Sequence, residues 1–173
     1  MTTITCHYYN EEGEIEVLAV PNIDDYPETF FRKYTDSPVE QEIARRLKWF
    51  PHPSIVRVLD VNPEHNWIDI EYLQIKSKVP FYPQSLHDAL DHFHSIGVVY
   101  IDIKPDNVGY SAADQTHKLF DFNMSGIVDI DQPSKWFFPP DEGYLFKRAK
   151  ELLPAPVTLY EYDRIILDEL WGY

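Results

Sequence analysis

The sequence predicts an α+β fold of one domain, residues 1–173, in which a β-rich part precedes a helix-rich part. Up to residue 73, short alternating or β-branched runs stand between polar turns, which is the pattern of strands. From residue 84 onward, apolar patterns with helix start and stop signals dominate. We place a linker at residues 74–83. The length of 173 residues and the hydrophobic content of 44% suit a single domain with a real core.

The chain opens with a predicted hairpin and a further strand. Residues 6–20 alternate between apolar and polar types on either side of an acidic turn that contains Gly13. This pattern is typical of a hairpin. Residues 28–34 predict a short strand. Because side chains alternate along a strand, Phe31 and Lys33 should share one of its faces.

A helix is predicted next, within residues 36–50. Ser37 is the expected N-cap, and Glu40, three residues later, would complete a capping box. Ile43 and Leu47, at i and i+4, form the expected apolar stripe. Two β-like runs follow, at 51–61 and 66–73.

The second part opens with a predicted helix at residues 82–97, capped near Ser85 and stopped by Gly97. A short strand and a loop are expected at 117–127, and the Pro- and aromatic-rich stretch 129–144 is expected to be irregular. The inward positions of the helix predicted at 82–97 are expected to be Leu86, Ala89, Leu90 and Phe93.

The C-terminal residues 159–173 predict an apolar helix. Its buried positions are expected to be Ile165, Ile166, Leu167 and Leu170.

The composition bounds the class of function. The net charge of −14 and the pI near 4.7 argue against a nucleic-acid or anionic-membrane binder, since phosphate recognition needs clustered Lys and Arg. A bound nucleotide remains compatible, because a metal ion can screen phosphates from carboxylates. No apolar run approaches the length of a membrane span, and the N-terminus lacks a signal region. With Cys6 as the single cysteine, we expect a cytoplasmic protein.

Four polar residues suggest a site for chemistry. Asp102, Lys104 and Asn107 lie close together in the stretch DIKPDN, and Asp121 follows an apolar strand. A carboxylate can accept a hydroxyl proton, a lysine can neutralise a moving phosphoryl group, and an Asn/Asp pair can hold Mg²⁺. This set of residues predicts phosphoryl transfer, which depends chiefly on positioning and charge.

These two blocks resemble eukaryotic-type protein kinases. The family pattern is H-R-D-L-K-P-x-N followed by D-F-G, and this chain has Y-I-D-I-K-P-D-N at 100–107 and D-F-N at 121–123. The lysine two residues after the aspartate favours the Ser/Thr branch. The resemblance implies that Asp102 and Lys104 are catalytic, that Asn107 and Asp121 hold Mg²⁺, and that ATP is the phosphate donor.

The resemblance extends upstream into the β-rich part. The stretch EIARRLKWFPHPSIVRVLDV resembles the helix C of kinases and the strand after it, so Glu42 matches the helix-C glutamate. Lys33 is the best match for the lysine that pairs with this glutamate and contacts the phosphates, with Arg32 as the rival. Ile70 sits at the gatekeeper position, and the backbone of Glu71 to Leu73 should bind adenine.

Several departures from the family pattern point to a minimal form. No G-x-G-x-x-G precedes Lys33, and the acidic stretch 10–17 takes its place. Ile101 replaces the usual arginine, so control by a phosphorylated activation loop is not expected. Tyr100 replaces His, and Asn123 replaces Gly. The later large-lobe helices of kinases are missing, and the resemblance therefore implies a bilobal kinase-like fold with a small β-rich N-lobe and a truncated helical C-lobe.

Three functions follow from this resemblance. The first is a minimal Ser/Thr-type protein kinase, weak or specialised in its phosphotransfer. The second is a pseudokinase-like module that docks on a kinase or on a partner of a kinase. The third, disfavoured by the lysine and proline after Asp102, is a small-molecule phosphotransferase. The partner would be a protein substrate or a kinase, and a homodimer could cover the truncated lobe.

Two further groups of residues have alternative interpretations. His87, Asp91 and His94 fall on one helical face and could bind a metal, although a solvated face also explains the pattern. The aromatic residues 136–138 could pack over the truncated part or form a partner surface.

Overall fold

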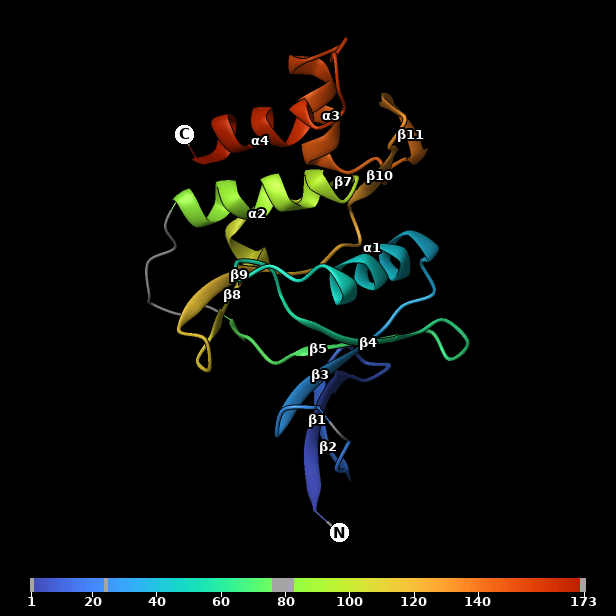
Figure 1. The fold of residues 1–173 in the computed structure, drawn as a ribbon, viewed down its shortest axis with the longest axis vertical. Helices are drawn as coiled ribbons and strands as arrows, with labels where there is room; N and C mark the ends of the chain where they lie inside the picture. The colour runs from blue at the N-terminus through green and yellow to red at the C-terminus, as the bar shows by residue number, and fades with distance from the viewer. Residues whose placement is uncertain (1, 24, 76–82, 172–173) are drawn as a thin grey trace.

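The computed structural model describes residues 2–23, 25–75 and 83–171. The chain is mixed α+β, as the sequence predicts, with a β-sheet at the N-terminal end and helices gathered at the opposite end (Figure 1). Among the described residues, none of the helices has the length and apolar character needed to cross a membrane.

A five-stranded sheet carries the N-terminal part. Its order is β2-β1-β3-β5-β4; β1 and β3 run parallel and the other neighbours are antiparallel. The hairpin predicted at 6–20 is confirmed, and Gly13 has a φ of +78° in its turn. The strands are β1 (Thr3–Tyr9), β2 (Ile15–Pro21), β3 (Thr29–Tyr34), β4 (Val58–Asn62) and β5 (Trp67–Glu71).

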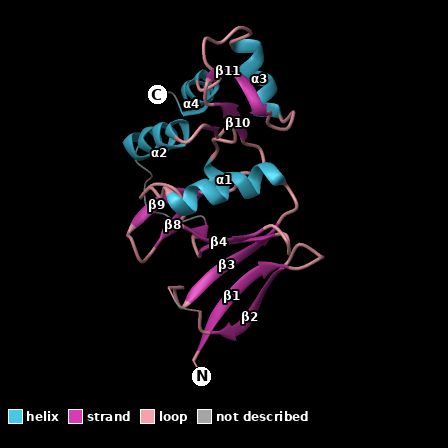
Figure 2. Cartoon of the chain, turned by 45° about the vertical axis from the view of Figure 1, so that its right-hand side comes forward, coloured by secondary structure: helices cyan, strands magenta, loops and turns pink. Residues whose placement is uncertain are grey.

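Helix α1 (Pro38–Trp49) lies between this sheet and the C-terminal helices (Figures 1 and 2). The predicted cap is confirmed, since the Ser37 hydroxyl accepts a hydrogen bond from the Glu40 N–H at 3.2 Å. The full capping box is wrong. The Ser37 N–H donates to Thr35 Oγ1, and the Glu40 carboxylate turns instead to Lys33.

Among the described residues, the C-terminal part is built on three α-helices, α2 (Pro83–Ser95), α3 (Tyr144–Leu152) and α4 (Glu161–Trp171). The four inward positions predicted for α2 are all buried, and Gly97 ends the helix with a φ of +79°. The helix begins at Pro83, so Ser85 lies in its first turn and is not the cap. Ile166 and Leu167 of α4 are buried as expected, whereas Ile165 is half-buried.

Two short sheets complete the fold. Of the predicted linker, Gln74–Ile75 form strand β6, Pro83 opens α2, and 76–82 lie outside the described residues. β6 pairs with β8 (Val108–Ser111), which pairs with β9 (Thr116–Leu119). Strand β7 (Val98–Val99) pairs with β10 (Gly126–Asp129).

The expectation of irregular structure at 129–144 is wrong. Strand β11 (Gln132–Phe138) pairs with β10 as a bulged hairpin, and α3 follows it. Pro133 is tolerated because β11 is the edge of the order β11-β10-β7, where a strand can lack one N–H donor. Trp136 stacks on Tyr162 at 6.5 Å and packs edge-on against Phe146 at 5.8 Å, which confirms the packing interpretation of this residue.

The largest apolar core spans both parts of the chain. It joins α1, α2, α4 and the short β7 and β10 strands into one cluster, which includes the fully buried Ile43, Phe93 and Ile127. A smaller cluster of Ile4, Cys6, Phe30 and Leu59 covers the opposite face of the five-stranded sheet. The sheet is therefore packed on two faces, and α1 links it to the helices.

Removing the α1 cap should destabilise the protein without rearranging it. Ser37→Ala leaves one helix N–H without its hydroxyl acceptor, which costs about 1 kcal/mol and lowers Tm by roughly 2–4 °C in a chain of this size. The matched control is Ser134→Ala, since Ser134 is exposed on β11. Equal melting curves for the two variants, measured by circular dichroism, would contradict the role of the cap.

Candidate active site

A buried aspartate on α4 holds the backbone just before the DIKPDN loop, residues 102–107. Asp163 is fully buried, and its carboxylate accepts the backbone N–H groups of Tyr100 at 2.9 Å and Ile101 at 2.7 Å. His94 of α2 contacts the same carboxylate through Nε2 at 2.8 Å. Asp163 therefore ties the loop to helices α2 and α4.

Ile101 adopts a strained backbone just before the loop. Its φ is +66°, in the left-handed region that β-branched residues rarely enter, which costs on the order of 1–3 kcal/mol. The conformation is held because the Ile101 N–H is bound to Asp163 and the side chain is buried, 1% exposed.

Asp102, Lys104 and Asn107 come together as predicted. The Asn107 amide donates to the Asp102 carbonyl oxygen at 2.9 Å and to its carboxylate at 2.7 Å. Lys104 Nζ lies 3.3 Å from the same carboxylate. Because the Asn107 amide nitrogen is committed to Asp102, its amide oxygen remains as an acceptor for a cation.

Lys33 lies between two carboxylates from distant parts of the chain. Its Nζ is 2.5 Å from Glu40 of α1 and 3.0 Å from Asp121, which follows β9. Burial alone would lower the pKa of Lys33, but the charges of Glu40 and Asp121 outweigh it and raise that pKa. The side chain is therefore a cation at neutral pH, joining the sheet, α1 and the loop at residue 121.

The expected pairing of Lys33 with Glu42 is wrong. Glu42 faces outward and pairs with Arg45 at 2.6 Å and Arg46 at 2.9 Å. Side chains two positions apart on an α-helix point in directions that differ by about 200°, so Glu40 and Glu42 cannot both face the sheet. The sequence did carry a signal for Glu40, because it continues the buried stripe Ile43, Ala44 and Leu47 at helical spacing.

Arg32 is separated from this cluster by the alternation of β3. It binds the fully buried Asp69 in two hydrogen bonds, at 2.7 and 2.8 Å, and its guanidinium lies 4.0 Å from the centre of the Trp67 ring. Lys33 rather than Arg32 lines the cavity described next.

A cavity of about 350 Å³ contains the Lys33 cluster, and we call it the first cavity. Its polar lining includes Lys33, Glu40, Asn107 and Asp121. The residues expected to surround adenine, Ile70, Glu71 and Leu73, also line it. The structure thus brings these side chains and the polar cluster to one place, and their role in nucleotide binding stays a prediction.

The β1–β2 hairpin borders the first cavity through Tyr9 and Ile15. Its acidic turn is closed locally, because the Asn10 side chain accepts the N–H groups of Glu12 and Glu14, both at 2.9 Å. The carboxylate-bearing residues of the turn are exposed. A hairpin thus stands at the cavity without a glycine-rich loop.

A second cavity of about 570 Å³ adjoins the DIKPDN loop. Asp102 and Lys104 line it, and Tyr144 and Leu145 of α3 form part of its rim. Asp121 lines both cavities, and its φ is +66°. This shared residue connects the Lys33 cluster with the DIKPDN loop.

The donor set at the meeting of the cavities fits a hard cation. Asn107 and Asp121 both line the first cavity and supply oxygen ligands, which Mg²⁺ prefers. Mg²⁺ usually takes only one or two protein carboxylates and completes its shell with water and phosphate oxygens. The face of α2 that carries His87, Asp91 and His94 does not offer such a set of metal ligands. His94 is turned away from it and contacts Asp163.

A buried ion pair behind the cavity was missed by sequence reasoning. Lys118 of β9 is buried and binds Glu71 at 2.6 Å and Asp114 at 2.5 Å. Glu71 also accepts the N–H of Arg57 at 2.8 Å. Nothing in the local pattern around Lys118 indicates its burial, because the partner Glu71 lies 47 positions away in the sequence. The pair holds Glu71, which lines the first cavity.

Comparisons with known proteins find serine/threonine protein kinases among the similar sequences. The chain is 30% identical over 137 residues to calcium/calmodulin-dependent protein kinase type 1 of Macrobrachium nipponense, covering 69% of this chain and 38% of that protein. It is 29% identical over 108 residues to serine/threonine-protein kinase pkn2 of Myxococcus xanthus, covering 53% and 13%. Ribosomal protein S6 kinase alpha-6 of Danio rerio is 40% identical over 65 residues, covering 38% and 8%.

The chain is related to serine/threonine protein kinases at low identity. No protein-family model matches it. The chain spans between 8% and 38% of the length of these three relatives. The relationship therefore concerns a kinase-like segment, and the activity of the whole relatives is not transferred with it.

Breaking the buried Lys118–Glu71 pair should lower the free energy of unfolding more than breaking the exposed Lys118–Asp114 pair. Lys118→Met leaves the Glu71 carboxylate buried without its partner, which should lower the free energy of unfolding by about 3–5 kcal/mol in urea titrations. Asp114→Asn is the control; its side chain is 55% exposed, so the loss should stay below about 1 kcal/mol. Lys118→Met combined with Glu71→Gln should recover most of the loss, and equal losses for the single and double variants would contradict the pairing.

Proposed function

We propose that this chain binds Mg·ATP and transfers the γ-phosphate to the hydroxyl of a serine or threonine in a protein, with weak or specialised activity. The observation that carries the proposal is the position of Asp121. It contacts Lys33 in the first cavity and also lines the second cavity, beside Asp102 and Lys104. A metal-binding carboxylate between a donor site and an acceptor site is what phosphoryl transfer requires.

The first cavity suits a nucleotide because its two ends differ in polarity. Ile70 and Leu73 supply an apolar wall for a base, and Lys33 supplies a cation for the α- and β-phosphates. The buried Glu40, 2% exposed, keeps Lys33 directed into the cavity. Asn107 and Asp121 would hold Mg²⁺, which when bound neutralises phosphate charge.

The second cavity suits the acceptor hydroxyl. Asp102 would orient the hydroxyl and take its proton as the oxygen–phosphorus bond forms and the bond to ADP breaks. Lys104, 3.3 Å from Asp102, would balance charge on the transferred group. The spacing of Lys104 from Asp102 and the relationship to serine/threonine kinases both support a protein hydroxyl as the acceptor.

Nucleotide binding should appear as a thermal shift. Saturating Mg·ATP, at about 100 times its Kd, adds about 2.7 kcal/mol of stability and should raise Tm by roughly 5–10 °C. Asp121→Ala should abolish the shift because it removes a metal ligand. Glu40→Gln should reduce it, whereas Glu42→Gln, on the outward face of the same helix, should not. A wild-type protein with no shift at millimolar Mg·ATP would overturn the proposal.

Phosphotransfer should depend on Asp102 separately from binding. Asp102→Asn keeps the size of the side chain but removes the proton acceptor, so transfer of labelled phosphate to a protein should fall at least 100-fold while the thermal shift remains. The readouts are autophosphorylation and a panel of Ser/Thr peptides. Equal transfer by wild type and Asp102→Asn would refute the catalytic role. A shift with no transfer by wild type would favour a nucleotide-binding module instead.

A further inference from the structure

Strand β2 is the outer edge of the five-stranded sheet. Among the described residues it pairs with β1 alone, at one end of the order β2-β1-β3-β5-β4. Figure 2 shows it as the strand of this sheet that lies furthest from helix α1. All of its residues except Val20 are exposed. An edge of this kind presents a row of backbone N–H and C=O groups to which another strand can bind.

The ladder with β1 shows which backbone groups of β2 face outward. At its two ends the Asn10 N–H donates to the Glu14 carbonyl at 2.9 Å, and the Asn22 N–H donates to the Thr2 carbonyl at 3.0 Å. Hydrogen-bonded pairs alternate along an antiparallel ladder, so every second residue of β2 turns its N–H and C=O away from β1. Within the described chain these groups have no backbone partner, and they belong to Ile15, Val17 and Ala19.

This edge lacks the features that commonly keep edge strands from pairing. Natural edges are often very short, bulged or marked by lysine. The register of β2 on β1 is continuous from Ile15 to Pro21, and the strand contains no lysine. Ile15 and Val17 are 56% and 60% exposed on one face of the sheet, and Leu18 is 53% exposed on the other. An added strand would therefore find apolar side chains on both faces.

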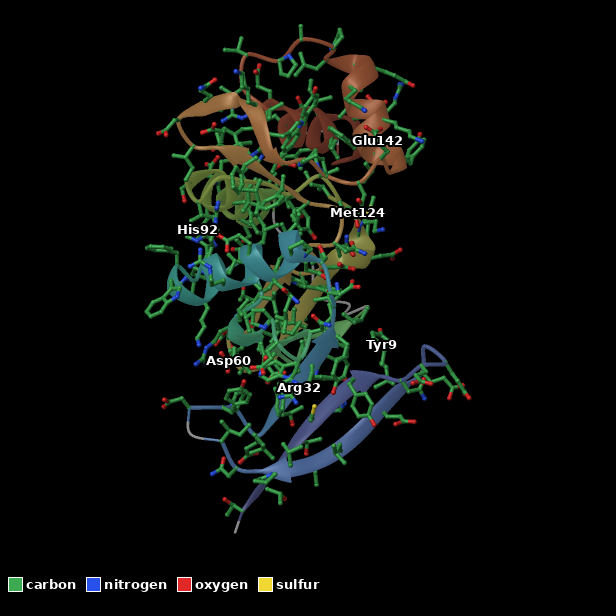
Figure 3. All side chains as sticks on the ribbon, turned by 90° about the vertical axis from the view of Figure 1, so that its right-hand side faces the viewer. Tyr9, Arg32, Asp60, His92, Met124 and Glu142 are labelled. Carbon is green, nitrogen blue, oxygen red and sulfur yellow. The ribbon has the colours of Figure 1, made fainter. Side chains whose placement is uncertain are left out.

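The edge is strongly acidic at the end where the hairpin turns. Residues 11–14 include three exposed glutamates, and the whole hairpin, 3–21, contains neither lysine nor arginine. Hydrogen bonds from the Asn10 amide and the Tyr8 hydroxyl lower the pKa of Glu16, which is ionised at neutral pH. In Figure 3 the turn projects from the rest of the chain on the side of Tyr9. A segment that pairs along β2 would reach this negative charge with one of its ends.

The charge also decides between two kinds of occupant. A second copy of this chain could pair with β2, but each copy has a net charge of −14, and two such molecules repel each other. A segment that carries lysine or arginine is attracted instead. Addition of a strand takes its affinity from main-chain hydrogen bonds and its selectivity from side chains at alternate positions.

We propose that the free edge of β2, from Ile15 to Ala19, binds an extended segment of another protein as a sixth strand of the sheet. The segment has apolar side chains at alternate positions and lysine or arginine at the end that lies beside the turn 11–14. This inference goes beyond the proposed function and does not depend on it, because β2 pairing requires neither nucleotide nor metal.

The test uses three fluorescently labelled peptides and measures anisotropy. The first is Lys-Lys-Val-Thr-Val-Thr-Val-Lys-Lys, which has charges at both ends and can bind in either direction. In the second, Pro replaces both Thr residues, which keeps the charge but prevents strand pairing. In the third, Glu replaces every Lys. Wild type should bind the first peptide at least about tenfold more tightly than either of the others, because it alone offers both strand pairing and positive charge.

Matched variants of the protein test the edge itself. Val17→Pro removes an outward N–H and leaves the ladder to β1 its donors, so binding of the first peptide should fall at least about tenfold. Val17→Thr keeps this N–H and should bind as wild type does. Ala19→Pro removes another outward N–H and serves as the second variant if melting curves show that Val17→Pro has lost its fold. Glu11→Gln combined with Glu12→Gln should weaken binding and reduce its dependence on salt.

Several outcomes would overturn the inference. One is equal binding of the first peptide and its proline counterpart, since the protein would then attract positive charge without pairing. Another is unchanged binding by folded Val17→Pro and Ala19→Pro. A third is a wild-type dimer in sedimentation that becomes a monomer in Val17→Pro, because the edge would then be occupied by a second copy. None of these results bears on the thermal shift with Mg·ATP, which tests the proposed function separately.

Discussion

The buried carboxylate of Asp163 is the constraint on which the rest of the site depends. Taking a carboxylate out of water is costly unless hydrogen bonds replace the lost hydration, and Asp163 has the N–H groups of Tyr100 and Ile101 and the ring of His94. These bonds hold Ile101 in a left-handed conformation that its branched side chain disfavours. The position of Asp102 therefore depends on Asp163 of α4, some sixty residues further along the chain.

A second ion cluster joins the sheet to this loop. Lys33 meets Glu40 and Asp121, so one cation links β3, α1 and the segment after β9. Asp121 carries the charge that Lys33 faces, and both would face phosphates and a metal in the proposed reaction. The charges of Lys33 and Asp121 that hold the cavity together are therefore the same charges that would bind phosphates and a metal ion in the proposed reaction.

The segment after Asp121 is held by packing rather than by charge. Trp136 of the β10–β11 hairpin stacks on Tyr162 and contacts Phe146, and Ser125 donates a hydrogen bond to the Tyr100 carbonyl at 2.9 Å. Where protein kinases have an arginine before the catalytic aspartate, this chain has the buried Ile101. Ring contacts and one hydrogen bond to the backbone of Tyr100 therefore hold the chain that follows Asp121.

The sequence by itself determined the local features: the hairpin, the cap at Ser37, the inward face of α2 and the cluster of polar residues in the DIKPDN loop. These follow from short-range periodicity and from hydrogen bonds between residues a few positions apart. Only the tertiary structure decided which partner each charge has. Glu40 replaces Glu42 because the direction of a helix face depends on what it packs against, and Lys118 pairs with Glu71 across strands that no local pattern connects. Strand β11 was likewise decided by packing, since Trp136 belongs to a stretch, rich in proline and aromatics, whose local sequence favours irregular structure. Ion pairs and buried aromatic contacts act through space, and a one-dimensional pattern records neither their distance nor their direction.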